Sequence, residues 1–437
     1  MFEVFSKAFG IKDLKHKLLF TFLIILIYRM GSAIPVPFID ASYIESAINQ
    51  AGSFLGYLDV MSGGGLSTAT IFALSITPYI NSSIIIQLLT VAIPALERLK
   101  DEGEQGRKKL SQITRYLTIV LALIQGTGYY LLLRAHYAVK YTRDFDGIFA
   151  AVIIVATLTA GTAFIVWLGE RVSERGIGNG ISIILFAGMV SRAPSAIMSL
   201  WHMIEAAMAG KYEFYAYVPI IVVIFFAMVV LIVVMHLGER RIPIQYAQRV
   251  VGRKMYAGQS AHIPVKVSMS GVMPIIFASS ILGMPSMISG FLQPEQGTFW
   301  YDFFSFFRYD SWSYAIIYFF LIIAFNFFYV TIQYNPIEIA NNLRKSNGSI
   351  PGIRPGKATS EYISKVLWRI SMVGAIGLAF IAVFPIVFSK LTLYISNVHL
   401  NLALGGTSIV IIVGVALETV RVIESQLTMQ KHKGFLG

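Results

Sequence analysis

Basic side chains are the groups in this sequence with the clearest chemical use. They concentrate in two long segments that also contain proline and glycine, residues 237–267 and 333–369. Guanidinium and ammonium groups bind phosphates or carboxylates, so these segments could form a docking surface for a large anionic partner, such as the RNA of a ribosome or an acidic motor protein. The simpler alternative is a pair of solvated basic loops held by anionic lipid. The candidate docking residues are Arg253, Lys254, Arg344, Lys345, Arg354 and Lys357.

Catalytic and metal-binding patterns are absent from the sequence. It contains no GxxxxGK[ST] phosphate loop, no HExxH zinc motif, no GxSxG elbow and no cysteine. The seven histidines show no metal spacing, and His136, His236 and His262 lie near the ends of apolar segments, where we expect solvated imidazoles. The glycines of residues 176–180 predict a tight turn. We therefore expect neither an enzyme nor a chain that binds a metal or a cofactor.

The elements that must position these groups are apolar. Apolar residues make up 56% of the 437 residues and charged residues only 13%, which excludes a water-soluble globular domain. Charge-free runs such as 214–237 exceed the ~20 residues that cross a bilayer as a helix. The sequence therefore predicts an all-α polytopic membrane protein. Its ten expected transmembrane helices lie near residues 18–34, 75–93, 116–135, 148–168, 180–200, 217–236, 268–290, 312–332, 370–389 and 403–420.

The distribution of charge predicts the orientation of these spans. An even number of spans puts both termini on one side of the membrane. That side would carry residues 1–17, 94–115, 169–180, 237–267, 333–369 and 418–437, which hold 27 of the 35 Lys and Arg. Because cytoplasmic loops carry the excess of Lys and Arg, we expect both termini to be cytoplasmic.

The spans divide the chain into four expected parts. Residues 1–17 mix phenylalanine with lysine and predict a short amphipathic helix on the membrane surface. A signal peptide is a weaker alternative, because no small-x-small cleavage site follows at the right place. Residues 18–200 form the N-terminal half with spans one to five, and residues 201–420 form the C-terminal half with spans six to ten and both basic loops. Residues 421–437 form a cytoplasmic tail.

One segment does not fit a simple helical bundle. After the small residues 62–65, the apolar piece 66–74 is too short to cross a bilayer, and Pro78 follows it. Such a piece can only re-enter the membrane and stay buried in protein or in a water-filled cavity. Pro274 and Pro285 are expected to interrupt the seventh span similarly. Interrupted helices at equivalent places in two halves are typical of inverted repeats, so we expect two pseudo-symmetric five-helix halves.

Isoleucines recur on these interrupted helices. Ile76 and Ile80 lie four residues apart and therefore on one helix face, while Ile276 and Ile411 lie in spans seven and ten. Packing in the core or against lipid is the simpler explanation. The functional alternative is an apolar constriction that seals a pore by excluding water.

Polar groups inside the spans are few and mostly neutral. Asn81 and Gln87 on the second span suggest a helix face that is not always dry, although an interhelical hydrogen bond explains any single such residue, Asn326 included. Ion-coupled transport normally needs ionisable groups at mid-membrane, and the one candidate, Arg29, lies near the end of the first span. An inverted-repeat transporter of a small solute is therefore the weaker alternative to a passive channel.

Five motifs follow one another along the chain: TIFALSITPYINSSIIIQLL (70–89), GERVSERGIGNGISI (169–183), MYAGQSAHIPVKVSMSGVMPIIFASS (255–280), IPGIRPG (350–356) and GGTS (405–408). Together they resemble the SecY family, the channel subunit of the bacterial Sec protein translocon. The resemblance implies a central pore between the two halves and a place in the bacterial plasma (inner) membrane. It also implies partners, namely the membrane subunits SecE and SecG, the SecA ATPase, the ribosome with its RNA, signal sequences, unfolded preproteins and the lipid bilayer.

The resemblance further implies roles for individual residues. Residues 62–72 correspond to the plug, a short helix that closes the outer funnel at rest, with the members Gly63, Gly64, Gly65, Leu66, Ser67, Thr68, Ala69, Thr70, Ile71 and Phe72. The pore ring corresponds to Ile76, Ile80, Leu185, Met189, Ile276 and Ile411. The lateral gate between spans two and seven corresponds to Asn81, Ile84, Gln87 and Met284. Arg354 matches a residue used by SecA, and Arg253 and Lys254 match the loop tip that SecA shares with the ribosome.

The expected function is a passive channel that moves unfolded secretory polypeptides across the membrane and releases transmembrane segments sideways into it. An alkyl ring offers ions no ligands, yet it can fit around an extended polypeptide of any sequence. A signal sequence is itself an apolar helix. Its burial, at about 25 cal/mol per Å² of apolar surface, favours parting of spans two and seven towards lipid.

Overall fold

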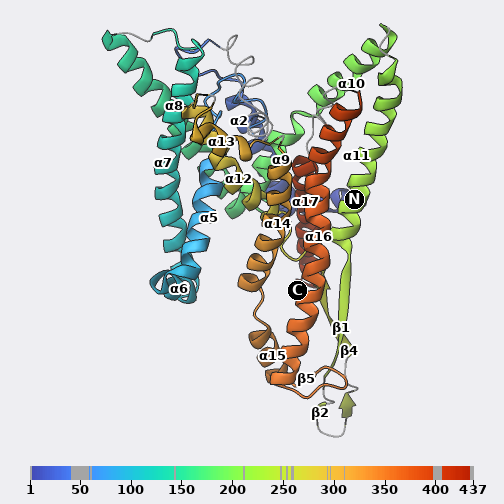
Figure 1. The fold of residues 1–437 in the computed structure, drawn as a ribbon. Helices are drawn as coiled ribbons and strands as arrows, with labels where there is room; N and C mark the ends of the chain where they lie inside the picture. The colour runs from blue at the N-terminus through green and yellow to red at the C-terminus, as the bar shows by residue number, and fades with distance from the viewer. Residues whose placement is uncertain are drawn as a thin grey trace.

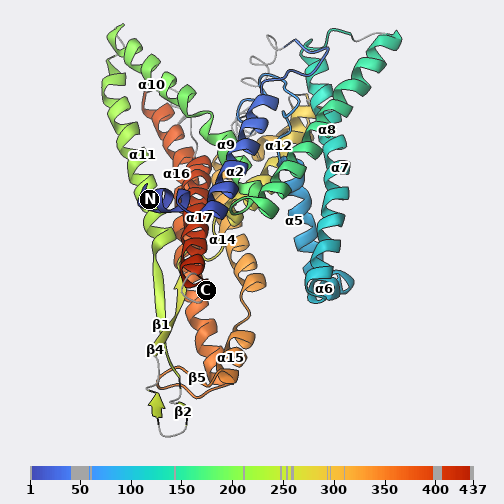
Figure 2. The ribbon, with the colours of Figure 1, turned by 180° about the vertical axis from the view of Figure 1, so that it is seen from behind.

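The computed structural model describes residues 2–40, 59, 62–141, 144–209, 212–246, 249–251, 254–256, 260–292, 294–295, 297–309, 311–396 and 406–433. The helices in these ranges are α1 (Phe2–Phe9), α2 (Lys12–Gly31), α5 (Thr77–Ala92), α6 (Pro94–Asp101), α7 (Glu104–Ala135), α8 (Asp144–Arg175), α9 (Gly180–Val190), α10 (Ala193–Met208), α11 (Glu213–Leu237), α12 (Met273–Leu292), α13 (Phe299–Phe306), α14 (Trp312–Gln333), α15 (Pro336–Lys345), α16 (Lys357–Ser396) and α17 (Gly406–Lys433). They form two groups that meet at the centre and diverge towards one end (Figures 1 and 2).

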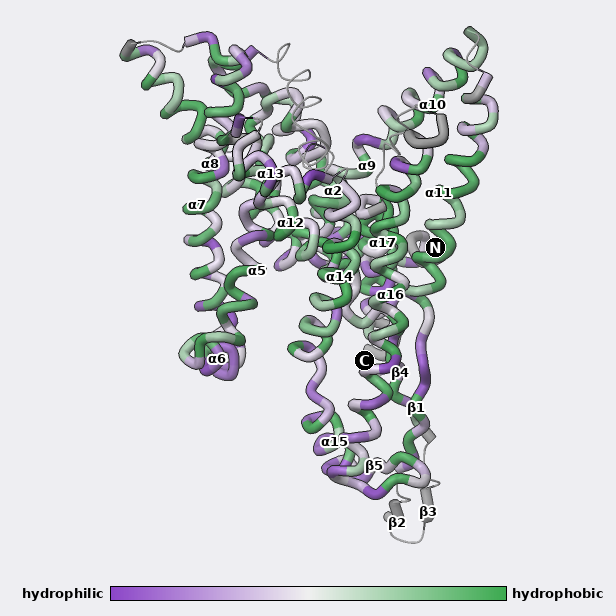
Figure 3. The backbone as a smooth tube through the Cα atoms, in the orientation of Figure 1, coloured by the Kyte–Doolittle hydropathy of each residue, from purple (hydrophilic) through white to green (hydrophobic). Residues whose placement is uncertain are grey.

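The multi-pass α-helical fold is confirmed. Six helical segments are long and apolar enough to cross a membrane, or seven if the bent pair α5 and α6 counts as one, and α12 contains a shorter apolar helix. Helices lie in all ten ranges where spans were predicted, although a turn divides the fifth range between α9 and α10. Hydrophobic residues run along the helices α7, α8 and α11, whereas hydrophilic residues gather at α6, at α15 and along the strand β1 (Glu239–Tyr246) (Figure 3).

Prolines explain where several helices begin. Pro78 and Pro94 lie in the first turns of α5 and α6, where a missing backbone N–H costs no hydrogen bond. Ile93, which precedes Pro94, has φ −111° and ψ 112°, and the two helices meet at 101°. Pro285 lies inside α12, so the prediction that it breaks the seventh span is wrong. Pro274 is the second residue of α12, so this helix begins at Met273 and not near residue 268.

The largest apolar cluster joins the two groups of helices. It contains Ile84 of α5 and Leu185 of α9 from one half of the chain, together with Ile276 of α12 and Ile386 of α16 from the other. The two halves are also in contact through α5 with α12 and through α9 with α17. The core therefore lies where the two halves meet.

The N-terminal segment packs on protein. The sequence predicted one amphipathic helix over residues 1–17, but this segment contains α1 and the first residues of α2. Because α2 continues past residue 17, the predicted boundary at that residue is wrong. Ala8 and Leu14 are 0% and 1% exposed, in a cluster with Ile423 and Leu427 of α17. The N-terminus is therefore tied to the C-terminal helix.

The two basic loops fold together. Residues 237–267 contain a hairpin of β1 and β4 (Ser260–Lys266), with β2 (Arg249–Val251) and β3 (Lys254–Tyr256) between them. The short strand β5 (Gly348–Ser349) comes from the second loop and pairs antiparallel with β1. Ile242, Ile244 and Val265 of the hairpin share a small apolar core with Leu343 and Ile363. We call this unit of β1, β4, β5, α15 and the start of α16 the basic platform.

Candidate pore and docking surfaces

The six predicted pore-ring side chains lie in one buried apolar cluster. They come from the start of α5 and from α9, α12 and α17, which belong to both halves of the chain. Their exposed fractions run from 0% to 6%; the six are Ile76, Ile80, Leu185, Met189, Ile276 and Ile411. The structure thus brings all six together, and their role in a pore stays a prediction. Such a cluster presents only alkyl and thioether groups, which do not replace the hydration shell of an ion.

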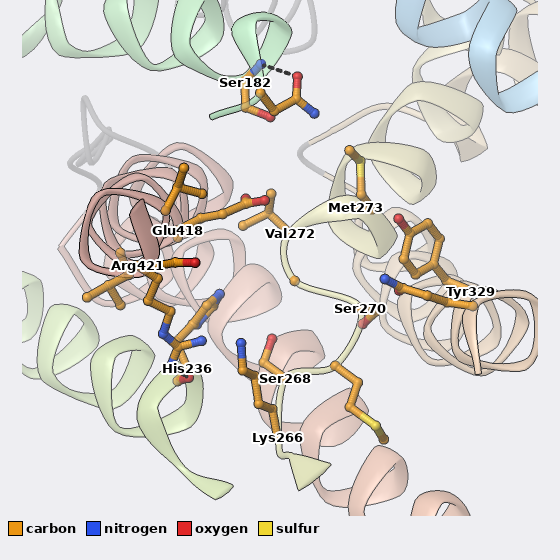
Figure 4. A pocket seen from close by; sticks show the side chains of 18 of the residues that line it. Ser182, His236, Lys266, Ser268, Ser270, Val272, Met273, Tyr329, Glu418 and Arg421 are labelled. Atoms are coloured by element: carbon orange, nitrogen blue, oxygen red, sulfur yellow. Dashed lines mark hydrogen bonds between the residues drawn. The ribbon is translucent and has the colours of Figure 1, made fainter. Parts of the chain in front are cut away.

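A cavity of about 600 Å³ lies beside this ring (Figure 4). Ser182, Val272 and Gly414 line it. Ser182 lies three residues before Leu185, Val272 lies four residues before Ile276, and Gly414 lies three residues after Ile411. Residues at that spacing stack along a helix, so the cavity is one helical turn from the ring. Asn179 lines the cavity too, and its side-chain oxygen accepts hydrogen bonds from the backbone N–H of Ile181 and Ser182 at the start of α9. Bends at residues 176–178, with Gly178 at φ +71°, lead from α8 into α9, as the glycines of this segment predict.

Charged groups from two elements meet at the cavity. Lys266 comes from β4, and Glu418 and Arg421 come from α17 (Figure 4). Nη2 of Arg421 donates a hydrogen bond of 2.6 Å to the carbonyl of His236, which holds the guanidinium against the end of α11. Burial and then the nearby charge of Arg421 lower the pKa of Lys266. His236 is only 7% exposed, so the prediction that its imidazole is solvated is wrong.

Sequence reasoning did not single out Lys266 or Arg421 as site residues. Each looks like an ordinary positive charge at the end of an apolar span. Only the fold brings them together at one cavity, because β4 and α17 lie far apart in the chain. The one signal available in the sequence was that Glu418 and Arg421 lie three residues apart at the end of the tenth span.

The predicted plug segment consists of turns. No α-helix forms over the described residues 62–72, so the expectation of a short helix is wrong there. Thr70 instead forms an isolated antiparallel bridge with Pro35, and Ile71 donates its backbone N–H to the carbonyl of Ile34 at 3.0 Å. Phe72 stacks on Tyr28 of α2 with ring centroids 5.8 Å apart. The segment is therefore fixed to the chain that follows α2.

The predicted lateral-gate residues lie on α5 and α12, which are in contact. Ile84 is buried in the central cluster and Met284 is half-buried. Gln87 donates a hydrogen bond of 3.1 Å to the hydroxyl of Ser83 on its own helix. Oδ1 of Asn81 is buried without a hydrogen-bond partner among the residues that the structure describes.

The start of α12 is anchored to the helices behind it. The hydroxyl of Ser270, three residues before α12, donates to Oδ1 of Asn326 on α14. Nδ2 of Asn326 donates in turn to the carbonyl of Ser371 on α16 at 3.0 Å. Asn326 thus makes the kind of interhelical hydrogen bonds expected of it. It joins three elements of the C-terminal half.

The basic platform gathers four of the six candidate docking residues. Arg344 and Lys345 end α15, Lys357 begins α16, and Arg354 lies in the turn between β5 and α16. All four side chains are exposed. Lys254 lies in β3, and Arg253 lies outside the described residues. The platform is therefore a structured, positively charged surface that could bind phosphates or carboxylates.

In the part of the chain that the structure describes, six helical segments are long and apolar enough to cross a membrane, and the two halves share one buried apolar cluster. This arrangement defines a polytopic α-helical membrane protein. The sequence model of the SecY family matches residues 70–420. The protein translocase subunit SecY of Streptomyces scabiei is 45% identical, and the match covers 100% of both chains. The chain therefore belongs to the SecY family.

Solved structures agree with this fold. A structure described as that of a protein conducting channel has a TM-score of 0.65 at 18% identity, over 94% of this chain and 92% of the other. Sec61 in the canine ribosome-channel complex from the endoplasmic reticulum has a TM-score of 0.62 at 18% identity, with the same coverage. At such low identity these likenesses speak for the fold alone.

Proposed function

We propose that this chain is a protein-conducting channel through which unfolded polypeptides cross the plasma membrane and from which transmembrane segments leave sideways into lipid. The observation that carries the proposal is the buried cluster that holds the six predicted ring side chains, contributed by both halves, with a cavity one helical turn from three of them. The membership of the SecY family and the function named for its relatives support the same conclusion. The chain is a channel subunit and not an enzyme.

The physical basis of the proposal is that one feature serves two needs. Alkyl side chains exclude water and ions while they touch one another, and they move aside at low cost when a chain passes between them. The polar cavity would receive the polypeptide before it reaches the ring, because its hydroxyl and charged groups can solvate backbone and side chains. Partners must supply the energy, since the sequence carries no phosphate-binding loop.

The plug and the gate complete this mechanism. In the proposal, residues 62–72 close the outer funnel at rest, and α5 and α12 separate to admit a signal sequence. The contact between the two helices supports this assignment, as does the buried, unpaired Oδ1 of Asn81 among the described residues. Separation would let that oxygen bind water, which lowers the cost of the open state.

The orientation is also proposed here. The N-terminal segment, the basic platform and the tail would face the cytoplasm of a bacterium, with residues 18–200 and 201–420 as the two halves of the channel. The support is that the inferred cytoplasmic segments hold 27 of the 35 Lys and Arg.

Partners would dock on the cytoplasmic side. The exposed cations of the basic platform fit the phosphates of ribosomal RNA and the carboxylates of the SecA ATPase. SecE and SecG would cover exposed apolar helix faces within the membrane. The ribosome-bound Sec61 structure shares this fold and supports a ribosome as a partner.

The test uses the absence of cysteine from the chain. A single cysteine is placed at Ile276 in the ring and, as a matched control, at Ile232, which is buried in the same cluster on α11 but is not a ring residue. Each variant is reconstituted with SecE and SecG and given a stalled secretory polypeptide with one cysteine. We expect a disulfide at position 276 that requires a functional signal sequence, and none at 232. No crosslink at 276, together with uptake of a small solute, would refute the channel.

A further inference from the structure

An ion pair joins the plug segment to the turn between α9 and α10. Nη2 of Arg192, the N-cap residue of α10, contacts the carboxylate of Asp59, which lies three residues before the plug segment. The side chain of Asp59 is 10% exposed and that of Arg192 is 26% exposed. The pair is therefore shielded from most of the water that weakens surface salt bridges.

Asp59 links the arginine to the plug backbone. Its Oδ1 accepts a hydrogen bond of 2.7 Å from the backbone N–H of Ser67, and its carbonyl accepts one of 2.8 Å from the backbone N–H of Gly64. These two hydrogen bonds join Asp59 to the plug segment at Gly64 and Ser67. Through Asp59, the charge of Arg192 therefore acts on the backbone of the plug segment and not on one flexible side chain.

Arg192 also touches the plug directly. Its Nη2 donates a hydrogen bond of 3.2 Å to the hydroxyl of Ser67. Gly64 has φ +94°, and a side chain there would begin only 3.1 Å from the guanidinium. A residue with a Cβ would strain the backbone and displace the arginine. The close approach of plug backbone and guanidinium depends on this glycine.

The contact lies next to the ring. Arg192 follows the ring residue Met189 by three positions, so it is about one turn further along the same stretch of chain. At the other end of the plug segment, Phe72 is buried in the cluster that contains the ring. Tyr129 of α7 holds the middle of the segment with a hydrogen bond of 2.6 Å to the carbonyl of Leu66. Among these contacts, the ion pair is the one between opposite charges, and it joins the plug to the turn that follows the ring-bearing helix α9.

We propose that Arg192 is a positioning residue that latches the plug over the closed ring through Asp59 and Ser67. This inference rests on the proposed function. A translocating chain that pushes the ring-bearing helix α9 aside also displaces Arg192, so opening of the ring and release of the plug are coupled. The coupling needs a cation at position 192 and, at position 59, a carboxylate that also accepts the backbone N–H of Ser67.

The experiment measures ion leak through the resting complex with SecE and SecG in planar bilayers. Arg192→Glu places two carboxylates together and is expected to raise the leak about tenfold. Arg192→Lys keeps a cation at position 192, leaves the hydrogen bond from Ser67 to Asp59 in place, and is expected to keep the leak within about twofold of the parent. Arg134→Glu, an exposed arginine in the last turn of α7, is the control and should leave the leak unchanged.

The outcomes separate the latch from the channel itself. Arg192→Gln, a milder change, is measured beside Arg192→Glu so that the result does not depend on one variant that fails to assemble. The latch is overturned if the leak stays at the parent level in both variants, or if Arg192→Lys leaks as much as Arg192→Gln. Removal of ring side chains is the separate test of the channel. If the ring variants leak and the Arg192 variants do not, the latch alone is refuted. If neither set of variants leaks, the sealing role of the ring is refuted as well.

Discussion

The alkyl ring predicts that removing carbon atoms at the constriction makes the resting channel leak. The perturbation is Ile276→Ala with Ile411→Ala, one residue from α12 and one from α17, which are 4% and 0% exposed. Each change removes three carbons. At ~0.8 kcal/mol per buried methylene, the pair takes about 5 kcal/mol of apolar transfer free energy from the ring. If a third of this free energy, about 1.6 kcal/mol, lowers the barrier to wetting of the constriction, the leak rises about fifteenfold.

The control pair must lose the same number of carbon atoms from the same apolar cluster, but at positions outside the ring. Ile232 of α11 and Ile386 of α16 are 0% and 3% exposed and lie in the same cluster. Ile232→Ala with Ile386→Ala should cost comparable stability, about 2–5 kcal/mol per site, and should raise the leak little. Both pairs are compared with the parent by thermal unfolding in detergent and by conductance in planar bilayers, reconstituted with SecE and SecG.

Two results would refute the reasoning. If the ring pair and the control pair leak equally, the leak follows from general loosening of the core and not from the ring. If the ring pair unfolds at a lower temperature but conducts no more than the parent, the six side chains are core residues without a sealing role. The thermal measurement distinguishes the second result from a substitution that the structure simply absorbs.

Two further predictions follow from the platform and from the polar anchor of α12. Arg354→Glu reverses an exposed charge on the platform and should slow SecA-driven, ATP-dependent transport in proteoliposomes several-fold. The control variant Arg134→Glu should leave the transport rate unchanged. An unchanged rate for Arg354→Glu would show that Arg354 is not part of the docking surface. Asn326→Ala leaves the hydroxyl of Ser270 and the carbonyl of Ser371 without this partner and should lower the free energy of unfolding by about 1–3 kcal/mol, measured by denaturation in detergent. An unaltered midpoint would show that other groups satisfy both atoms.

The sequence predicted the helices well because a membrane span has a strong local signature. Length and lack of charge locate segments such as 214–237 without any tertiary information, since every backbone group in lipid must be paired within the helix. Helix boundaries were less predictable. α16 runs over 40 residues because its polar first turns continue outside the apolar stretch, where hydropathy gives no signal.

The structure of the basic segments could not be predicted from the same signals. The β1 strand contains proline and alternates few apolar residues, and only its pairing with β4 and β5 gives those residues a core. Residues 62–72 looked like a short helix by resemblance, yet hydrogen bonds to Ile34 and to Asp59 hold them as turns. In both cases contacts distant in the chain decided the conformation.

The sequence by itself determined the class of the protein and the places of its helices, because hydrophobicity and helix periodicity are local properties. The tertiary structure decided which charges meet. Lys266 comes beside Arg421, and Asp59 beside Arg192, although nothing in the sequence pairs them. The physical reason is that the interaction between two charges depends on their distance in space, and that distance is set by how the elements of the chain pack.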